Sequence, residues 1–206
     1  MRIAALAFAT TALGLASCAG TGYAPSGQEL AISREVSANV GFERLSQQYL
    51  DAMTELNPIY GSQLGDHAHD GELPDISAAA RMIDLRTMQG FLAALKTIPM
   101  ERLRRSNQVD YLLLKNALEY GVWSQEVEQQ WAWNPQAYNN MASYALYGLV
   151  ARDYAPFEER FDALVSRMEK LPGFLEAARA QIDVPRVPKV HAETVAAQNR
   201  GIMSII

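Results

Sequence analysis

The stretch 157-FEERFDALVSRMEKL-171 decides the fold class of this chain. Its large apolar residues return at steps of four, three, four and three: Phe157, Phe161, Leu164, Met168 and Leu171. This spacing places them on one face of an α-helix. Pro156 stands where a proline suits the start of a helix. Pro172 is expected to end this helix, and a shorter one is expected to run from there to Ile182.

The same helical period recurs on both sides of this stretch. Further helices are predicted over residues 33–56, 58–64, 77–98, 106–128, 138–151 and 190–206. The segment 106–128 carries apolar residues on two faces, and we expect it to be a central helix. No stretch shows the alternating pattern of a β-strand. The sequence therefore predicts an all-α fold, an irregular array of about seven helices without an internal repeat.

The N-terminal residues have the pattern of a secretion signal. Arg2 precedes an apolar run over residues 3–15, which is typical of a signal peptide and too short to span a bilayer. The following Leu15-Ala16-Ser17-Cys18 resembles the bacterial lipobox, and Cys18 is the only cysteine among 206 residues. The resemblance implies cleavage before Cys18 and lipidation of its thiol. Several acyl chains together anchor a protein firmly to a membrane.

These signals divide the chain into three parts. Residues 1–17 are predicted to be a lipoprotein signal peptide, and 18–32 the lipidated cysteine followed by a flexible tether rich in Gly, Ser, Thr and Pro. Residues 33–206 are predicted to form the helical body. Ala19 rather than aspartate follows the cysteine. We therefore expect a protein of the bacterial cell envelope, anchored in the outer membrane and facing the periplasm.

The charge balance argues against nucleic acid as a partner. The chain has 18 Lys and Arg against 23 Asp and Glu, a formal net charge of -5. Its densest cationic group is confined to Arg102, Arg104 and Arg105. Nucleic-acid binding normally needs a basic patch or stripe. The predicted partner is instead the membrane, reached through the lipid on Cys18.

The aromatic residues near the middle of the chain suggest a possible binding groove. Six of them lie close together in sequence: Trp131, Trp133, Tyr138, Tyr144, Tyr147 and Tyr154. Because aromatic side chains bury large areas, we expect most of this group in the core. Trp131 and Trp133, together with Tyr138, are the candidates for a groove that binds a peptide or a sugar.

The histidines and three of the arginines are weaker candidates for functional residues. The three histidines, His67, His69 and His191, do not form a His-Glu-x-x-His motif. The loop around His67 and His69 is expected to be solvated, with a metal site as the alternative. Arg152, Arg160 and Arg167 are expected to pair with nearby glutamates at the surface, with carboxylate binding as the alternative. We expect no catalytic residue, metal ligand or cofactor site in this chain.

Four stretches together resemble a known family. They are 55-ELNPIYGSQLGDHAHDGELPDIS-77, 107-NQVDYLLLKNALEY-120, 133-WNPQAYNN-140 and 160-RFDALVSRMEKLPGFLEAARAQI-182. They are similar to the N-terminal half of the bacterial domain of unknown function family 885. Its markers here are P-x-x-G-x-x-L-G-x-H over residues 58–67 and R-x-x-x-L-x-x-R-x-x-x-L-P over residues 160–172.

The resemblance implies a part of a larger protein. Such proteins are several hundred residues longer and are similar to helical zinc metallopeptidases of the gluzincin type, whose His-Glu zinc signature would follow residue 206. The apolar ending GIMSII over residues 201–206 also suggests a truncated chain. We therefore expect the non-catalytic N-terminal portion of a lipid-anchored zinc metallopeptidase. The alternative is a complete small helical lipoprotein that binds a protein or peptide partner.

Overall fold

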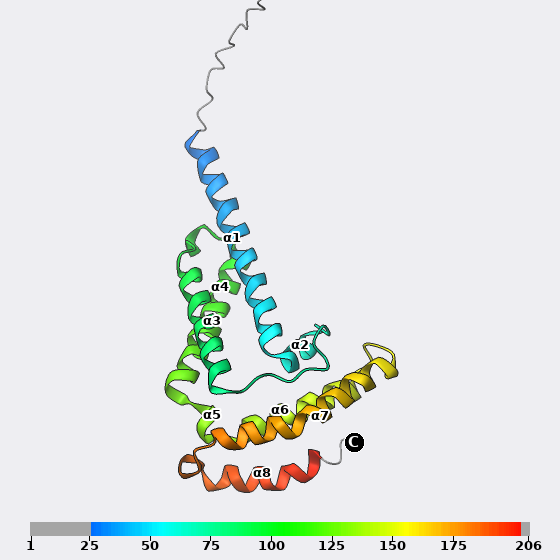
Figure 1. Cartoon of the computed structure of the whole chain (residues 1–206). Coiled ribbons are helices and arrows are strands. Elements are labelled where there is room, and N and C mark those ends of the chain that lie inside the picture. The colour runs from blue at the N-terminus through cyan, green and yellow to red at the C-terminus, as the bar shows by residue number, and fades with distance from the viewer. Residues whose placement is uncertain (1–25, 203–206) are drawn as a thin grey trace, which may run out of the picture.

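The computed structural model describes residues 26–202, and these form an all-α array (Figure 1). The predicted fold class is confirmed. Within the described residues there are eight α-helices and no strand. The helices are α1 (Gly27–Leu56), α2 (Pro58–Leu64), α3 (Ala78–Lys96), α4 (Arg105–Trp123), α5 (Gln130–Trp133), α6 (Pro135–Ala151), α7 (Phe157–Gln181) and α8 (Lys189–Ile202).

The helices form two layers that meet at an angle. In Figure 1, α1, α3 and α4 run side by side as a long bundle, and α6, α7 and α8 lie across its lower end. Within the second layer α6 contacts both α7 and α8. The short helix α2 contacts both α1 and α6 and so joins the two layers.

Each layer has its own buried apolar core. The bundle is centred on Phe42, Leu95, Leu103, Tyr111 and Leu118. The second layer holds two smaller clusters, one around Tyr138 and Phe174 and one around Leu146 and Leu164. Because the two layers are packed separately, their junction is where the chain can leave a hollow.

Helix α1 begins at Gly27, inside the segment predicted to be a flexible tether. Ser26 caps this helix: its Oγ accepts a hydrogen bond from Glu29 N at 3.3 Å, and Ser26 N donates to Glu29 Oε2 at 2.7 Å. This reciprocal capping box satisfies two backbone donors that the first turn would otherwise leave unpaired. The predicted signal peptide and Cys18 lie outside the described residues.

Helix α7 continues through Pro172, and the prediction that Pro172 divides it is wrong. A proline inside a helix removes one backbone hydrogen bond. Pro172 is exposed, so water can bond the carbonyl that loses its partner. Phe174 and Ala178 then bury the next two turns of the same helix. Burial on the inner side therefore outweighs the local cost of the proline on the outer side.

Two predicted apolar faces are in fact partly exposed. Tyr111 and Leu118 of α4 are buried, but Leu113 on the other face is 64% exposed, so the prediction of a central helix is wrong. In α7, Phe157 and Phe161 are 61% and 47% exposed. The buried face of α7 is instead centred on Arg160, Leu164, Arg167, Phe174 and Ala178.

Candidate functional site

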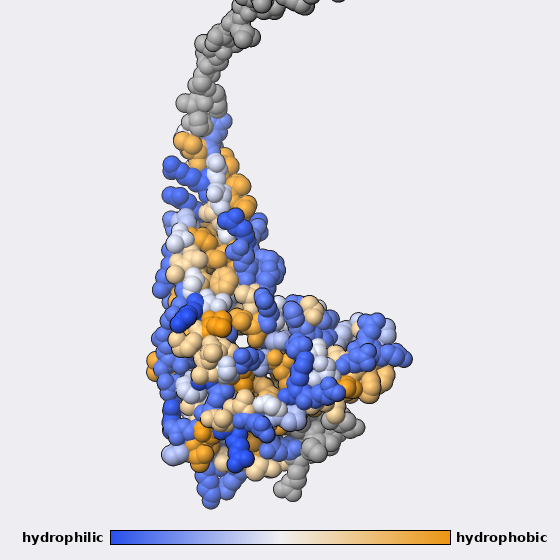
Figure 2. All heavy atoms as spheres, in the orientation of Figure 1, coloured by the Kyte–Doolittle hydropathy of each residue, from blue (hydrophilic) through white to orange (hydrophobic). Residues whose placement is uncertain are grey.

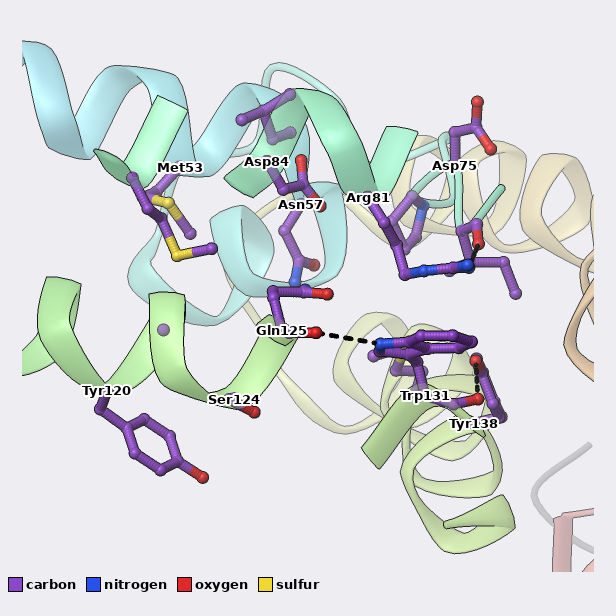
Figure 3. A pocket seen from close by; sticks show the side chains of 16 residues that line it. Met53, Asn57, Asp75, Arg81, Asp84, Tyr120, Ser124, Gln125, Trp131 and Tyr138 are labelled. Atoms are coloured by element: carbon purple, nitrogen blue, oxygen red, sulfur yellow. Dashed lines mark hydrogen bonds between the residues drawn. The ribbon is translucent and has the colours of Figure 1, made fainter. Parts of the chain in front are cut away.

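A cavity of about 300 Å³ lies between the end of the bundle and the second layer (Figure 3). We call it the Trp131 cavity. It is enclosed by α1, α3, α4 with the turn that follows it, α5 and α6. Its lining includes Met53, Asn57, Asp75, Arg81, Asp84, Met88, Gly121, Ser124, Gln125, Trp131, Tyr138 and Met141. Its volume is at the small end of the range of about 300–1,000 Å³ that is usual for ligand sites.

Trp131 is fixed from three directions. Its indole Nε1 donates to the carbonyl of Gln125 at 3.4 Å, and Tyr138 OH donates to the carbonyl of Trp131 at 2.7 Å. The Arg81 guanidinium lies over the indole, 4.0 Å from the ring centroid (Figure 3). Arg81 also donates to the carbonyl of Ile76 at 3.1 Å. The indole is therefore a rigid wall, because both its polar edge and one of its faces are occupied.

The backbone beside Trp131 has two irregular features. Residues Ser124–Glu128 form a π-helical turn at the end of α4, and Gln129 after it is left-handed, with φ 54 and ψ 45. Non-glycine residues rarely adopt this conformation, because it brings Cβ close to the backbone. π-Helical turns are common at functional sites. Here the turn supplies Ser124 and Gln125 to the cavity wall.

Asp84 is a half-buried carboxylate without a partner. None of the described residues donates a hydrogen bond to it or pairs with it as a cation. Burial, and after it the negative charge of Asp75, raise the pKa of Asp84. Asp75 itself accepts a hydrogen bond from Ser77 N at 2.8 Å. Figure 3 shows Asp75 and Asp84 on either side of Arg81, with Asp84 near Asn57.

One glycine allows the cavity wall to close. A Cβ atom on Gly121 of α4 would overlap the Sδ atom of Met88 on α3. The absence of that Cβ lets the Met88 side chain lie against α4. Methionine is flexible and fills irregular space well. The size of the cavity is therefore sensitive to residue 121.

The structure separates the three residues predicted to form a groove. Trp131 and Tyr138 both line the cavity. Trp133 does not line it: its Nε1 donates to the carbonyl of Glu128 at 2.8 Å, and its ring packs edge-on against His191. Tyr144 and Tyr147 are 55% and 56% exposed, so the expectation that they belong to the core is wrong.

Sequence reasoning missed Arg81 and Asp84. Helix α3 was predicted from its apolar residues, and Arg81, Asp84 and Met88 follow one another at steps of three and four. This spacing puts an arginine and an aspartate on one face with a methionine. That mixture was the available signal for a polar group beside an apolar cavity.

A second polar region lies beneath α7, where Arg167 is fully buried. Its guanidinium donates to Ser62 Oγ at 2.8 Å and to the carbonyls of Ala145 at 2.8 Å and Glu72 at 3.0 Å. The prediction that Arg167 pairs with glutamates at the surface is wrong. Burial lowers the pKa of Arg167, and the nearby charge of Asp70 acts in the opposite direction.

Asp70 completes this region, which we call the Arg167 cluster: Ser62, His67, Asp70, Tyr154 and Arg167. Asp70 accepts from Ser62 Oγ at 2.5 Å and from Tyr154 OH, and His67 Nδ1 lies 2.9 Å from its Oδ2. The His67 ring stacks on Tyr154 with centroids 3.6 Å apart. Burial and the contact with Asp70 raise the pKa of Tyr154. The loop predicted to be solvated is thus anchored through buried Asp70.

The other two arginines of this region also serve the fold. Arg160 is buried and pairs with Asp153 at 2.6 Å, and it donates to the carbonyl of Leu149 at 3.0 Å. The prediction of glutamate pairing at the surface is therefore wrong for Arg160 too. Arg152 is exposed and donates to the carbonyl of Gln63 at 2.9 Å.

The side chains that commonly bind metal ions lie dispersed in the described part of the chain. Within residues 26–202, no three or more His, Cys, Asp or Glu side chains come together in a way that could hold a metal ion. His67 is engaged with Asp70, and His191 lies 3.2 Å from Asn134 Oδ1. The residues present do not fit the zinc that the family resemblance implies for longer relatives. We therefore derive no metal-dependent step for this chain.

The helices define an all-α protein with a ligand-sized cavity at the junction of two layers. The chain belongs to the family described as "Bacterial protein of unknown function (DUF885)", whose model matches residues 58–206. No protein with a curated description matches it. Both family markers contribute to the Arg167 cluster, because Ser62 and His67 come from the first and Arg167 from the second.

A solved structure is similar to most of the chain. It is described as a "putative lipoprotein of unknown function" from Shewanella oneidensis, with a TM-score of 0.73 and 27% sequence identity. The match covers 80% of this chain and 29% of the other. This chain therefore spans less than a third of that protein. Among the described residues, no helix is both long and apolar enough to cross a membrane.

Proposed function

We propose that this chain is the helical, peptide-binding part of a lipid-anchored cell-envelope protein, and that the zinc and catalytic residues of a metallopeptidase are not among its own. The Trp131 cavity is the observation that carries this proposal. It combines methionine and aromatic walls with a few polar groups, as ligand sites usually do. A volume of about 300 Å³ suits one or two side chains of a peptide.

The comparison with the longer structure supports the proposal that this chain corresponds to one part of a larger protein. The chain corresponds to 29% of that protein. In longer members of the family, we propose that these helices form one wall of a substrate cleft. The residues of this chain would then position a peptide, and the chemistry would belong to the remaining part.

Helix α1 is long enough to act as a spacer between the membrane and the cavity. Met53 lies 26 residues after Gly27 on this helix, which at 1.5 Å per residue is about 40 Å. Figure 1 shows the start of α1 at the end of the molecule far from α6 and α7. With a lipid on Cys18, α1 would hold the cavity well clear of the outer membrane, on its periplasmic side.

The anchor has a direct test. In cells, the unaltered protein is expected in the membrane fraction and to incorporate labelled fatty acid. Cys18→Ser removes the thiol that would carry the lipid, and it should move the protein to the soluble fraction without label. Unchanged membrane association of Cys18→Ser would contradict the anchor and leave the cavity untouched.

Peptide binding can be followed through Trp131. We expect short apolar peptides to change the tryptophan fluorescence of the purified full chain in a saturable manner. Gly121→Ala should weaken this binding, because the new Cβ displaces Met88 into the cavity. Gly148→Ala is the matched control, since a Cβ there meets no atom within 4 Å. Mass spectrometry of the same mixtures should show intact peptide, and cleavage products would contradict the non-catalytic assignment.

A docking surface for a protein is the second candidate function. Phe157 and Phe161 on α7 are exposed with ring centroids 5.7 Å apart. Exposed apolar groups of this kind often mark protein contacts. If peptide binding survives Gly121→Ala but is lost in Phe157→Ser, the ligand site is this surface and not the Trp131 cavity.

A further inference from the structure

Asp84 is the feature of the Trp131 cavity that the apolar walls do not explain. A half-buried carboxylate normally has a hydrogen-bond donor or a cation beside it, because burying an unpaired charge is costly. Among the described residues Asp84 has neither. Its raised pKa reflects burial and the charge of Asp75, with no compensating cation.

The one Lys or Arg among the residues that line the cavity, Arg81, is already engaged. Arg81 stacks on Trp131 and donates to the carbonyl of Ile76. Its electrostatic effect is felt at Tyr138, where it opposes the rise in pKa caused by burial. It does not form an ion pair with Asp84. The positive charge that Asp84 lacks is therefore not supplied from within the cavity wall.

Asp84 also lies where two hollows meet. A second hollow of about 320 Å³ shares Leu56, Pro74, Asp75 and Asp84 with the Trp131 cavity and continues past Glu55 and His69. Glu55 and Asp75 add negative charge on this side, while the carboxylate of Glu72 is paired with Lys170 at 2.7 Å. Asp84 therefore borders both hollows, so a ligand in either one lies beside it.

We propose that the Trp131 cavity selects peptides by a primary ammonium group on an apolar stem, which pairs with Asp84. The inference rests on the proposed peptide-binding function and names the chemistry that would be recognised. The stem would lie against Met53, Met88 and Trp131, and the ammonium would reach the carboxylate. Long cationic side chains bury their methylene groups in this manner while keeping the charge paired or solvated.

Two sources can supply such a group, a lysine side chain or a free peptide N-terminus. Three peptides separate them: acetyl-Ala-Lys-Ala-amide, acetyl-Ala-norleucine-Ala-amide, and Ala-norleucine-Ala-amide with a free N-terminus. Norleucine has a linear apolar stem like that of lysine but no charge. Binding to the purified full chain is measured by calorimetry near neutral pH.

At least one of the two ammonium-bearing peptides should bind about tenfold or more tightly than the neutral norleucine peptide, as expected for a charge-assisted hydrogen bond. Asp84→Asn should abolish this ratio, because the amide keeps the shape of the side chain without its charge. Asp162→Asn is the matched control and should preserve the ratio, because Asp162 is exposed on α7 and lines neither hollow.

The possible outcomes separate this inference from the proposed function. Equal binding of all three peptides, or a ratio that survives in Asp84→Asn, overturns the ammonium selection but leaves peptide binding intact. Failure of every peptide to bind the unaltered chain overturns both. If Asp84→Asn did not fold, the comparison of lysine with norleucine on the unaltered chain would still decide the question.

Discussion

The Arg167 cluster and the Trp131 cavity both place charged groups in the interior, but they treat those groups differently. In the cluster, the Arg167 guanidinium, the Asp70 carboxylate and the Ser62 hydroxyl all have partners. In the cavity, Asp84 has none among the described residues. A fully bonded buried network stabilises one arrangement of helices, whereas an unpaired one costs stability. The contrast indicates that the cluster holds the fold together, and it supports the proposal that the cavity binds a ligand.

The two regions also differ in how they relate to the rest of the chain. The cluster joins α2, α6 and α7 through bonds from one arginine to backbone carbonyls on separate segments. The cavity is bounded by side chains with adaptable shape, such as Met53, Met88 and Met141. Figure 2 shows hydrophilic and hydrophobic residues intermixed over the visible face of the molecule.

The largest predicted effect tests the cluster. Arg167→Met keeps much of the side-chain length but removes every donor. Ser62 Oγ and three backbone carbonyls then lose their bonds from the guanidinium, and Asp70 loses a nearby positive charge. We expect the free energy of unfolding to fall by about 3–5 kcal/mol in urea denaturation. Arg179→Met, at an exposed position of the same helix, is the control and should change stability by less than about 0.5 kcal/mol. A loss below that of an ordinary surface change would mean that the cluster is not structural.

A smaller loss is expected from Tyr154→Phe. The variant keeps the ring that stacks on His67 and removes only the hydroxyl that donates to Asp70. Hydrogen bonds to charged groups contribute about 1.5–3 kcal/mol, and we expect a loss of that size in thermal or urea unfolding. Tyr147→Phe is the matched control, because Tyr147 is 56% exposed. Equal effects of the two variants would argue against a special role of the bond to Asp70.

Most of the fold could be predicted from the sequence, because helical period is a local property. The spacing of apolar residues predicted the helices around α3, α4 and α6, and the prolines marked several of their boundaries. The errors arose where tertiary packing overrides local preference. Pro172 lies inside α7 because Phe174 and Ala178 continue its buried face, which sequence period alone does not weigh against the cost of a proline.

The candidate site could be predicted only in part. Trp131 and Tyr138 stood out because they are large aromatic residues near a helix boundary. The burial of Arg160 and Arg167 could not be predicted, since it depends on carbonyls from α6 and the loop after α2 that converge only in three dimensions. Asp84 taken alone looks like an ordinary surface residue, and only its helical spacing from Arg81 and Met88 carried a signal.

The strained backbone at the edge of the cavity gives a prediction of opposite sign. Gln129→Gly removes the Cβ from a left-handed position and should raise stability by about 0.5–1 kcal/mol, after the entropy cost of glycine. Gln130→Gly is the matched control one residue later, within helix α5, where glycine should lower stability by about 1 kcal/mol. Both are measured by urea denaturation. If both variants lose stability equally, residue 129 is not under strain and the cavity edge is an ordinary helix junction.

The smallest predicted effect concerns the pH dependence of stability at Asp84. The pKa of Asp84 is raised in the folded chain, so the folded chain binds a proton at this carboxylate more tightly than the unfolded chain does. The unaltered chain should therefore lose stability as pH rises through the interval from the unfolded pKa to the raised folded pKa, and recover none of it above that interval. Asp84→Asn cannot ionise, so its gain in stability over the unaltered chain should be absent below this interval, grow through it and stay constant above it. Asp75→Asn removes the negative charge that contributes to the raised pKa of Asp84, and it should show a smaller gain in stability with the same sign.

Thermal unfolding across pH 3 to 8 in about 0.1 M salt would measure these differences in stability. A gain in Asp84→Asn that is the same at every pH would mean that the carboxylate is not held unpaired, and the distinction between a bonded cluster and an open cavity would fail at its central residue.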